Sequence, residues 1–152
     1  LLNIKVYIVT DDLLGAHGGF DFFNLDNKNW PSVQLPAYKV PRTESLADFK
    51  KRLASQFHVS NSDRTRFWTF YPRRNKTVRL DEPIPVEEET KPIGHFVNRL
   101  PATSGTPFVL YFEKFGTSNA VMPGPETICL SFKFYDPEHE QLKFVGKWYV
   151  PS

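Results

Sequence analysis

The stretch that decides the fold is Ser45-Leu46-Ala47-Asp48-Phe49-Lys50-Lys51-Arg52-Leu53-Ala54-Ser55-Gln56-Phe57. Its first four residues form a capping box, in which the Ser45 hydroxyl can accept from the amide three residues on while the Asp48 carboxylate reaches back. Apolar residues then recur at helical spacing, at Leu46, Phe49, Leu53 and Phe57. The pattern predicts an amphipathic helix that begins after Ser45, with an outward face of Lys50, Lys51, Arg52 and Gln56.

Strand patterns lie on both sides of this helix. Residues 2–10 place Ile4, Val6 and Ile8 on one face, the period of a half-buried strand. Residues 11–29 are polar and glycine-rich and predict an inserted surface loop, followed by an edge strand at 32–40, because Pro36 cannot donate to a ladder. After the helix we expect a strand, a basic turn, a returning strand, an acidic loop, a short helical turn and a final apolar strand, at residues 66–71, 72–76, 77–80, 81–89, 92–100 and 108–115.

The end of the chain predicts a separate hairpin. Residues 116–126 have the Ser, Asn, Pro and Gly composition of a linker, so we expect units at 1–115 and 127–152 with this linker between them. Around a turn at 136–140, apolar residues alternate with polar ones and predict one apolar face, made of Ile128, Leu130, Phe132, Phe134, Leu142, Phe144, Trp148 and Val150.

Composition excludes several classes of protein. The chain has 152 residues with a formal net charge of +2, and its 14 Phe, 6 Tyr and 3 Trp provide a core that a disordered chain would lack. No apolar run approaches the roughly 18 to 20 residues of a membrane span, and we expect no signal peptide. The single Cys129 cannot form an internal disulfide, which fits a reducing compartment.

The order of elements through residue 115 is that of the β-grasp, or ubiquitin-like, fold, an α+β class in which a mixed sheet wraps one capped helix; here the first hairpin carries a long insertion. The segments Ser45-Leu46-Ala47-Asp48-Phe49, Arg66-Phe67-Trp68, Phe132-Lys133-Phe134-Tyr135-Asp136-Pro137 and Leu142-Lys143-Phe144-Val145-Gly146-Lys147-Trp148-Tyr149-Val150-Pro151 resemble the tandem ubiquitin-like region of HAUSP-type ubiquitin-specific proteases. The opening strand, with Asp11-Asp12 and Gly15-Ala16-His17-Gly18 after it, is similar as well.

The resemblance implies a division of labour within a longer protein. Residues 1–115 resemble the first ubiquitin-like domain, and residues 127–152 resemble the opening hairpin of the second. In that family the catalytic residues belong to a different domain, and the acidic partner-binding loop lies later in the second domain, after the position of Ser152. The resemblance therefore implies a module without catalytic residues in a deubiquitinating cysteine protease of the nucleus or cytoplasm.

The residues themselves favour no catalytic, metal or cofactor site. A thiol protease needs a thiolate beside an imidazole, but Cys129 lies in mid-strand with no flanking motif, and we interpret it as a small residue on a sheet face. The histidines and cysteine have no zinc-binding spacing, and residues 136–140 are interpreted as a solvated turn. Gly15, Gly18 and Gly19 lack phosphate-binding spacing.

Two features favour binding of a macromolecule. From Lys39 to Arg79 the chain has eleven Lys or Arg residues against three acidic ones, a pattern that could bind nucleic acid or steer an acidic protein partner. We expect Phe67 to point inward and Trp68 to lie on the outer sheet face, where by resemblance ubiquitin carries its hydrophobic patch. The candidate partner-binding residues are Arg66, Trp68, Arg73 and Arg74. The alternative is that the second unit or the 11–29 loop covers Trp68.

The predicted function is that of a non-catalytic protein-interaction module that recruits or positions substrates and regulators, with a nucleic-acid-binding domain as the alternative. The apolar face of the 127–150 hairpin is too large to stay in water. In a full-length protein we expect the rest of the second ubiquitin-like domain to cover it, whereas for this chain the cover is either the first domain, folding back through the linker, or a second copy of the chain. We expect the second copy, and therefore self-association, because the hairpin edges also offer unpaired backbone groups.

Overall fold

A computed structural model describes residues 3–16, 35–72, 78–97, 108–115, 123–124 and 126–152. Its elements follow in the order β1 (Asn3–Val9), α1 (Asp11–Ala16), β2 (Ala37–Pro41), α2 (Leu46–Gln56), η1 (Ser62–Arg64), β3 (Thr65–Pro72), β4 (Val78–Pro83), η2 (Val86–Thr90), α3 (Ile93–Val97), β5 (Phe108–Lys114), β6 (Thr127–Asp136) and β7 (Gln141–Pro151). Among these residues no helix is long and apolar enough to cross a membrane.

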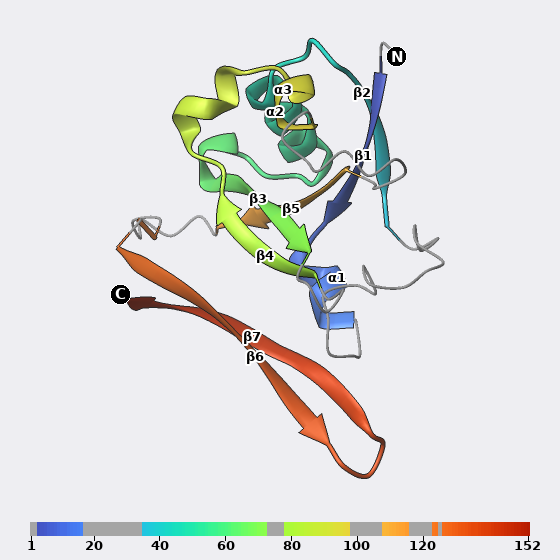
Figure 1. Ribbon diagram of the computed structural model, residues 1–152, viewed down its shortest axis with the longest axis vertical. Coiled ribbons are helices and arrows are strands. Elements are labelled where there is room, and N and C mark those ends of the chain that lie inside the picture. The colour runs from blue at the N-terminus through green and yellow to red at the C-terminus, as the bar shows by residue number, and fades with distance from the viewer. Residues whose placement is uncertain (1–2, 17–34, 73–77, 98–107, 116–122, 125) are drawn as a thin grey trace.

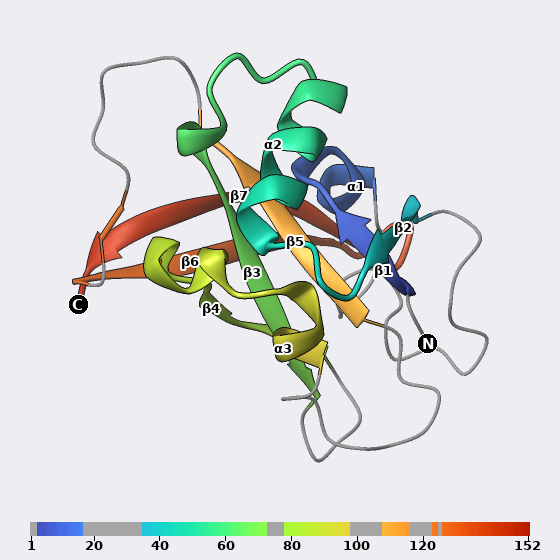
Figure 2. The same ribbon diagram turned by 90° about the horizontal axis from the view of Figure 1, so that it is seen from above.

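Strands β1 to β5 form one mixed sheet in the order β2-β1-β5-β3-β4, in which β1 runs parallel to β5 and the other pairs are antiparallel. Helix α2 lies across one face of this sheet (Figures 1 and 2). This is the β-grasp arrangement, so the predicted α+β fold class is confirmed. Among the described strands, β6 and β7 pair only with each other, in a two-stranded sheet of their own.

Helix α2 begins where the capping box predicts. The Ser45 hydroxyl accepts from the backbone amide of Asp48 at 3.2 Å. The helix ends at Gln56 and is capped by Phe57, whose amide donates to the Leu53 carbonyl at 2.9 Å. The next residue, His58, has a φ of 58°, which turns the chain away from the helix axis.

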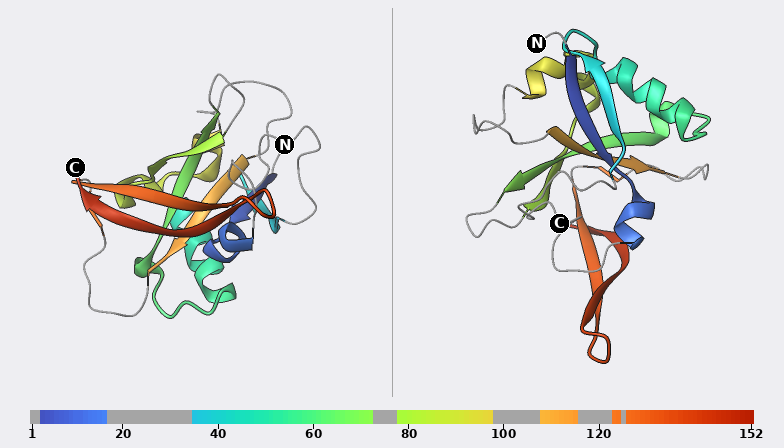
Figure 3. Two further views of the ribbon diagram at one scale, coloured as in Figure 1. Left: turned by 90° about the horizontal axis from the view of Figure 1, so that it is seen from below. Right: turned by 90° about the vertical axis from the view of Figure 1, so that its right-hand side faces the viewer.

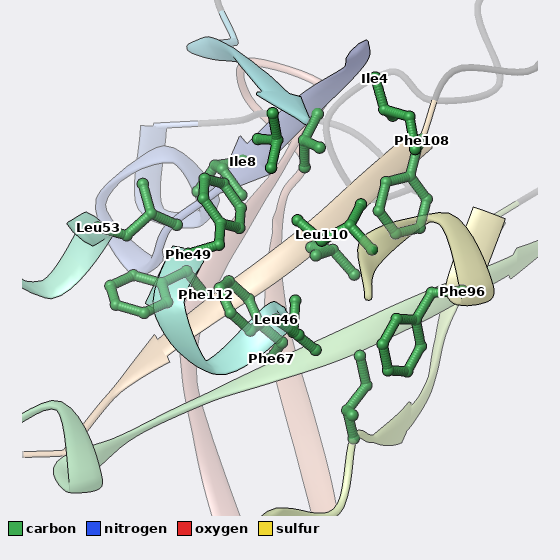
Figure 4. Packing of buried hydrophobic residues seen from close by; sticks show 14 of the residues in the cluster. Ile4, Ile8, Leu46, Phe49, Leu53, Phe67, Phe96, Phe108, Leu110 and Phe112 are labelled. Atoms are coloured by element: carbon green, nitrogen blue, oxygen red, sulfur yellow. The ribbon is translucent and has the colours of Figure 1, made fainter. Parts of the chain in front are cut away.

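The apolar stripe of α2 packs into the sheet as predicted. Leu46, Phe49 and Leu53 are fully buried, and the Phe49 ring stacks on that of Phe67 with centroids 5.9 Å apart. Phe67 in turn contacts Phe112 of β5 at 5.4 Å. Figure 4 shows these rings between α2 and the strands, where they form the main core.

Lys50 was predicted on the outward face of α2, and this prediction is wrong. The residue is only 5% exposed. Its Nζ lies 2.8 Å from Glu89 Oε2 of η2 and donates to the Thr65 carbonyl at 3.3 Å. A lysine at the edge of a helix stripe can bury its methylenes and still pair its charge when a carboxylate lies at the rim of the core.

Two other expectations need correction. The predicted loop at 11–29 begins with helix α1, while residues 17–34 lie outside the described part of the chain. The predicted edge strand is shorter than expected, because β2 begins at Ala37 after Pro36, but it does lie at the edge of the sheet. The predicted hairpin at the end of the chain is present as β6 and β7.

Candidate functional site

The face of the five-stranded sheet opposite α2 is covered by the β6–β7 hairpin. Tyr7, Val9, Trp68 and Tyr111 form a second buried cluster there, because alternate residues of each strand point to opposite faces. Cys129 and Tyr149 of the hairpin pack against this cluster. Figure 3 shows the hairpin on this side of the sheet, with its turn extending away from the rest of the molecule.

A buried carboxylate lies at the centre of this contact. In β5, Leu110 and Phe112 point toward α2, so Glu113 points toward the hairpin, where it is 1% exposed. Its Oε1 accepts from Arg66 Nε at 2.7 Å and from Trp68 Nε1 at 2.9 Å. Its Oε2 accepts from Lys147 Nζ and from the Tyr149 hydroxyl. One side chain therefore joins β3 and β5 to β7.

Further hydrogen bonds extend this cluster in two directions. Lys147 Nζ donates to the Tyr111 hydroxyl at 2.7 Å and lies 3.4 Å from Asp11 Oδ1, to which the Tyr111 hydroxyl itself donates. On the other side, Arg66 donates to the Tyr149 hydroxyl and to the Pro123 carbonyl, each at 3.0 Å. We call this set the Glu113 network; it consists of Asp11, Arg66, Trp68, Tyr111, Glu113, Lys147 and Tyr149.

The electrostatics of the network stabilise one protonation state. Burial by itself would raise the pKa of Glu113, but Lys147, Tyr149 and Trp68 donate to the carboxylate and together lower the pKa below its ordinary value. Burial raises the pKa of Tyr149, and the hydrogen bond to Glu113 raises it further. Glu113 is therefore ionised at neutral pH, and Tyr149 keeps the proton that it donates.

Cation–π contacts with aromatic rings accompany these hydrogen bonds. The guanidinium of Arg66 lies 5.1 Å from the Trp68 ring centre and 5.4 Å from that of Tyr149, so it is held between a ring of the sheet and a ring of the hairpin. Lys147 Nζ lies 5.0 Å from the Tyr111 ring centre. Both cations therefore contact the sheet and the hairpin together.

The opposite face of the hairpin is apolar and exposed. Residues on this face alternate with Cys129 and Tyr149, which point toward the sheet. Each side chain is between 38% and 60% exposed; we call the set the hairpin outer face, and it consists of Ile128, Leu130, Phe132, Phe134 and Trp148.

The aromatic pair at the centre of this face has a defined geometry. The rings of Phe132 and Trp148 meet edge to face, with centroids 5.0 Å apart. The Trp148 ring lies over Gly146, since a Cβ at that glycine would come within 2.9 Å of a ring carbon. A larger residue at position 146 would therefore displace the tryptophan.

The predicted apolar face was partly wrong, because β7 contains a bulge. The register shifts between Phe132 and Lys133, so Val145 is left without a partner, and beyond it Leu142 pairs with Tyr135 rather than with a member of the outer face. The extra residue moves Leu142 to the other side of the hairpin, and a strict alternation cannot anticipate this.

Of the four predicted partner-binding residues, the structure describes two, and both contact the hairpin. Trp68 lies on the outer sheet face as predicted, but it is only 8% exposed, because the hairpin covers it. Of the two alternatives for Trp68, the structure therefore supports the second, in which another part of the same chain covers the side chain. Arg66 contacts the same hairpin through Tyr149. Arg73 and Arg74 lie outside the described residues.

Two further candidates have ordinary structural explanations. Burial raises the pKa of the Cys129 thiol, whereas a nucleophilic cysteine needs a lowered pKa. Asp136, Glu138 and His139 place ligand-type atoms within 4.8 Å of one another. However, Asp136 accepts from the Glu138 amide at 3.0 Å and lies 2.7 Å from His139 Nδ1, the bonds of an aspartate-initiated turn.

Glu113, Lys147 and Tyr149 were not predicted as site residues. The available signal was Glu113 itself, a single carboxylate that directly follows the apolar run Phe108–Phe112 in β5. It lies in alternation with Tyr111, on the face that the helix stripe does not cover. A buried acid at such a position needs cationic partners, but the sequence does not say which ones.

Comparisons with known proteins match the chain to parts of ubiquitin-specific proteases. The family model described as the ICP0-binding domain of Ubiquitin-specific protease 7 matches residues 65–152, more than half of the chain, and this range includes Arg66, Glu113 and the hairpin. Ubiquitin C-terminal hydrolase 13 of Arabidopsis thaliana is 27% identical over 93% of this chain and 13% of its own length. Ubiquitin C-terminal hydrolase 12 of the same plant is 28% identical over 78% of this chain and 11% of its own length.

The chain therefore spans about an eighth or less of the length of these relatives. Among solved structures, the C-terminal ubiquitin-like domain of mouse tubulin-specific chaperone e matches 78% of this chain and 92% of its own, with a TM-score of 0.43 and 13% identity.

Proposed function

The chain belongs to the family of the ICP0-binding domain of ubiquitin-specific protease 7, and from this premise we propose that it is a non-catalytic, ubiquitin-like protein-interaction module of a deubiquitinating cysteine protease. The full protein would be nuclear or cytoplasmic, and the module would recruit or position substrates and regulators for an active site in another domain. The name of the family model, which refers to ICP0 binding, and the hydrolase relatives support a role in binding proteins.

The observation that carries the proposal is the hairpin outer face. Its five large apolar residues lie on one surface and include the Phe132–Trp148 pair. From their exposed fractions this surface amounts to about 500 to 600 Å², at the upper end of the patches that monomers expose. Exposed aromatic residues are frequent anchors of protein interfaces.

For the isolated chain we propose that a second copy occupies this face. The first unit packs on the polar face of the hairpin through Cys129 and Tyr149, and so does not cover the apolar one. Two outer faces packed together would bury about 1,000 to 1,200 Å² in total, near the lower limit of a specific interface. The pairing would therefore be weak and would give way to a partner that offers a better apolar surface.

Sedimentation velocity at rising concentration tests the self-association. The expected result is a concentration-dependent shift from monomer to dimer that disappears in Phe132→Ser/Trp148→Ser, whereas Val86→Ser, a change at an exposed valine on η2, leaves the shift in place. A chain that stays monomeric at all concentrations, or a dimer that survives the double substitution, would refute the self-association.

Site-specific photo-crosslinking in cells tests the partner-binding role. We propose placing a photo-reactive phenylalanine analogue at Phe134, which is 60% exposed, and at Val86, which is 71% exposed on η2, in this chain expressed in cells. Position 134 should capture partner proteins that position 86 does not capture. The same products at both positions, or none at position 134, would contradict the proposed interface.

The non-catalytic part of the proposal is tested with ubiquitin carrying a fluorogenic C-terminal amide. We expect no turnover by this chain, since the one thiol has a raised pKa. Turnover that disappears in Cys129→Ala would overturn this part of the proposal.

The nucleic-acid alternative has less support. Two of the cations in the basic stretch, Lys50 and Arg66, are paired with the buried carboxylates of Glu89 and Glu113. Such cations do not contribute to a basic surface. A gel-shift titration over a range of salt concentrations should show no complex; a complex that weakens steeply with salt would revive the alternative.

A further inference from the structure

We propose that Glu113 is the positioning residue that fixes the hairpin on the ubiquitin-like sheet and thereby sets the direction in which the hairpin outer face points. The inference deepens the proposed function, because that face is the surface proposed to bind partners. It concerns the geometry of a single chain, however, and can be tested without any partner.

Other contacts between the hairpin and the sheet cannot fix the orientation by themselves. The hairpin forms its own two-stranded sheet, so no strand ladder joins it to β1–β5. The apolar contact of Cys129 and Tyr149 with the Trp68 cluster is non-directional. Directional bonds therefore have to set the orientation. In the described residues Glu113 accepts from Arg66, Trp68, Lys147 and Tyr149, and the bonds that cross the contact without it, from Lys147 to Tyr111 and from Arg66 to Tyr149, are made by side chains that Glu113 itself holds in place.

The two oxygens of Glu113 divide their partners between the two units. Within the described part of the chain, Oε1 accepts from β3, through Arg66 and Trp68, and Oε2 accepts from β7, through Lys147 and Tyr149. If the hairpin rotates or slides, the donors on Oε2 lose their acceptor. Those on Oε1 are unaffected. The carboxylate thus selects one position of the hairpin.

The charges reinforce this selection. Arg66 and Lys147 both carry a positive charge, and Glu113 is the carboxylate that pairs with both. Without its charge the two cations would face each other across a mostly buried contact with one acid, Asp11, at the margin near Lys147. Buried cations without a counter-charge are costly, so the hairpin should leave the sheet.

The chain contains a matched control. Glu89 is also a buried glutamate, 3% exposed, and it is paired with a lysine, Lys50. Its partner lies on α2, within the ubiquitin-like unit and on the other side of the sheet. Glu89→Gln therefore removes the same kind of buried charge without touching the hairpin.

Amide hydrogen exchange in the intact chain, read separately for β6–β7 and for α2, tests the proposal. A two-stranded hairpin is only marginally stable by itself, so its amides should lose protection on leaving the sheet. We expect Glu113→Gln to speed exchange in β6–β7 by about tenfold or more while α2 changes by less than about twofold. Glu89→Gln should do the reverse. Unchanged exchange in β6–β7, or the same effect from both variants, would overturn the proposal.

Lys147→Met covers the case in which Glu113→Gln does not fold, since unchanged exchange in β6–β7 of this variant would also overturn the proposal, and where Glu113→Gln folds the two changes together form a double-mutant cycle. Lys147→Met changes the hairpin side of the contact, outside the core beneath α2, and should also speed exchange in β6–β7 by about tenfold. Adding Glu113→Gln to Lys147→Met should then contribute less than about twofold, because the bond between them is already lost. Full additivity would refute the positioning role. Loss of partner capture with normal exchange would instead count against the proposed function alone.

Discussion

The two faces of the five-stranded sheet are held by different kinds of interaction. Beneath α2 the contact is almost wholly apolar, with Phe49, Phe67 and Phe112 in direct ring contact. Beneath the hairpin, aromatic side chains surround the buried carboxylate of Glu113, which joins two cations to the sheet. Apolar burial supplies free energy without direction, whereas the Glu113 network supplies direction. The contact with α2 therefore stabilises the fold, and the contact with the hairpin fixes the orientation of the hairpin.

The largest expected effect lies on the apolar face. Phe49→Ala should lower the free energy of unfolding by about 3 to 5 kcal/mol, because it leaves a cavity where the ring stacks on Phe67. Chemical denaturation measures this loss. Lys51→Ala, on the exposed side of the same helix, should change the free energy by less than about 0.5 kcal/mol. Equal losses would mean that the two sides of α2 do not differ in packing.

The second-largest effect on stability is expected at the ion pair between Lys50 and Glu89, at the edge of the apolar face. Lys50→Ala should lower the free energy of unfolding by about 3 kcal/mol, since it leaves the carboxylate of Glu89 buried without its partner. The double change Lys50→Met/Glu89→Leu should be far less costly, because apolar groups can replace a buried pair. A double variant as unstable as Lys50→Ala would show that this pair, like the Glu113 network, is needed for geometry.

The helix cap gives a smaller effect. Ser45→Ala should lower the free energy of unfolding by about 1 kcal/mol, because the Asp48 amide loses its acceptor. Ser55→Ala, the same change on the exposed side of α2, should be neutral or slightly stabilising, since alanine is the better helix former. Thermal denaturation of the two variants side by side gives the comparison; the opposite order would refute the assigned cap.

The smallest effect on overall stability is a pH dependence confined to the hairpin. Because the pKa of Glu113 is lowered when the hairpin is bound, its contribution is fully present above the ordinary value of 4.5 and is lost as pH falls toward the lowered pKa. The charged and titratable groups that face it are Arg66 on β3, Tyr111 on β5, Asp11 on α1, Cys129 on β6, and Lys147 and Tyr149 on β7.

Nuclear magnetic resonance of the hairpin between pH 6 and pH 3 should therefore report release of β6–β7 before the α2 core changes. Glu113→Gln should lack this transition. Loss of both regions at the same pH, or a transition that persists in the glutamine variant, would show that Glu113 does not control the contact.

Sequence reasoning predicted the apolar face well and the polar face poorly. The spacing of Leu46, Phe49 and Leu53 indicated the helix and its buried side, because hydrophobic periodicity is a local signal. The burial of Lys50 depends on Glu89, which is 39 residues away in sequence. Local patterns contain no information on such a partner.

The same limit applies to the candidate site. Glu113 finds Arg66 and Lys147, which are 47 and 34 residues away, only after β3, β5 and β7 have been brought together. The bulge at Val145 is likewise invisible in an alternating sequence, and it decides which residues of β7 join the outer face. The outcome for Trp68 depended on this tertiary contact and could not be decided beforehand.

The central claim is that the hairpin turns its polar face toward the sheet and its apolar face toward solvent. Trp68, at 8% exposure, and Trp148, at 50%, report the two faces directly. We propose recording their indole N–H resonances, assigned with Trp→Phe variants, in dilute monomeric protein with a soluble paramagnetic gadolinium chelate. The Trp68 resonance should stay sharp, because its N–H donates to Glu113, and that of Trp148 should broaden. A sharp Trp148 resonance together with a broadened Trp68 resonance would contradict the account.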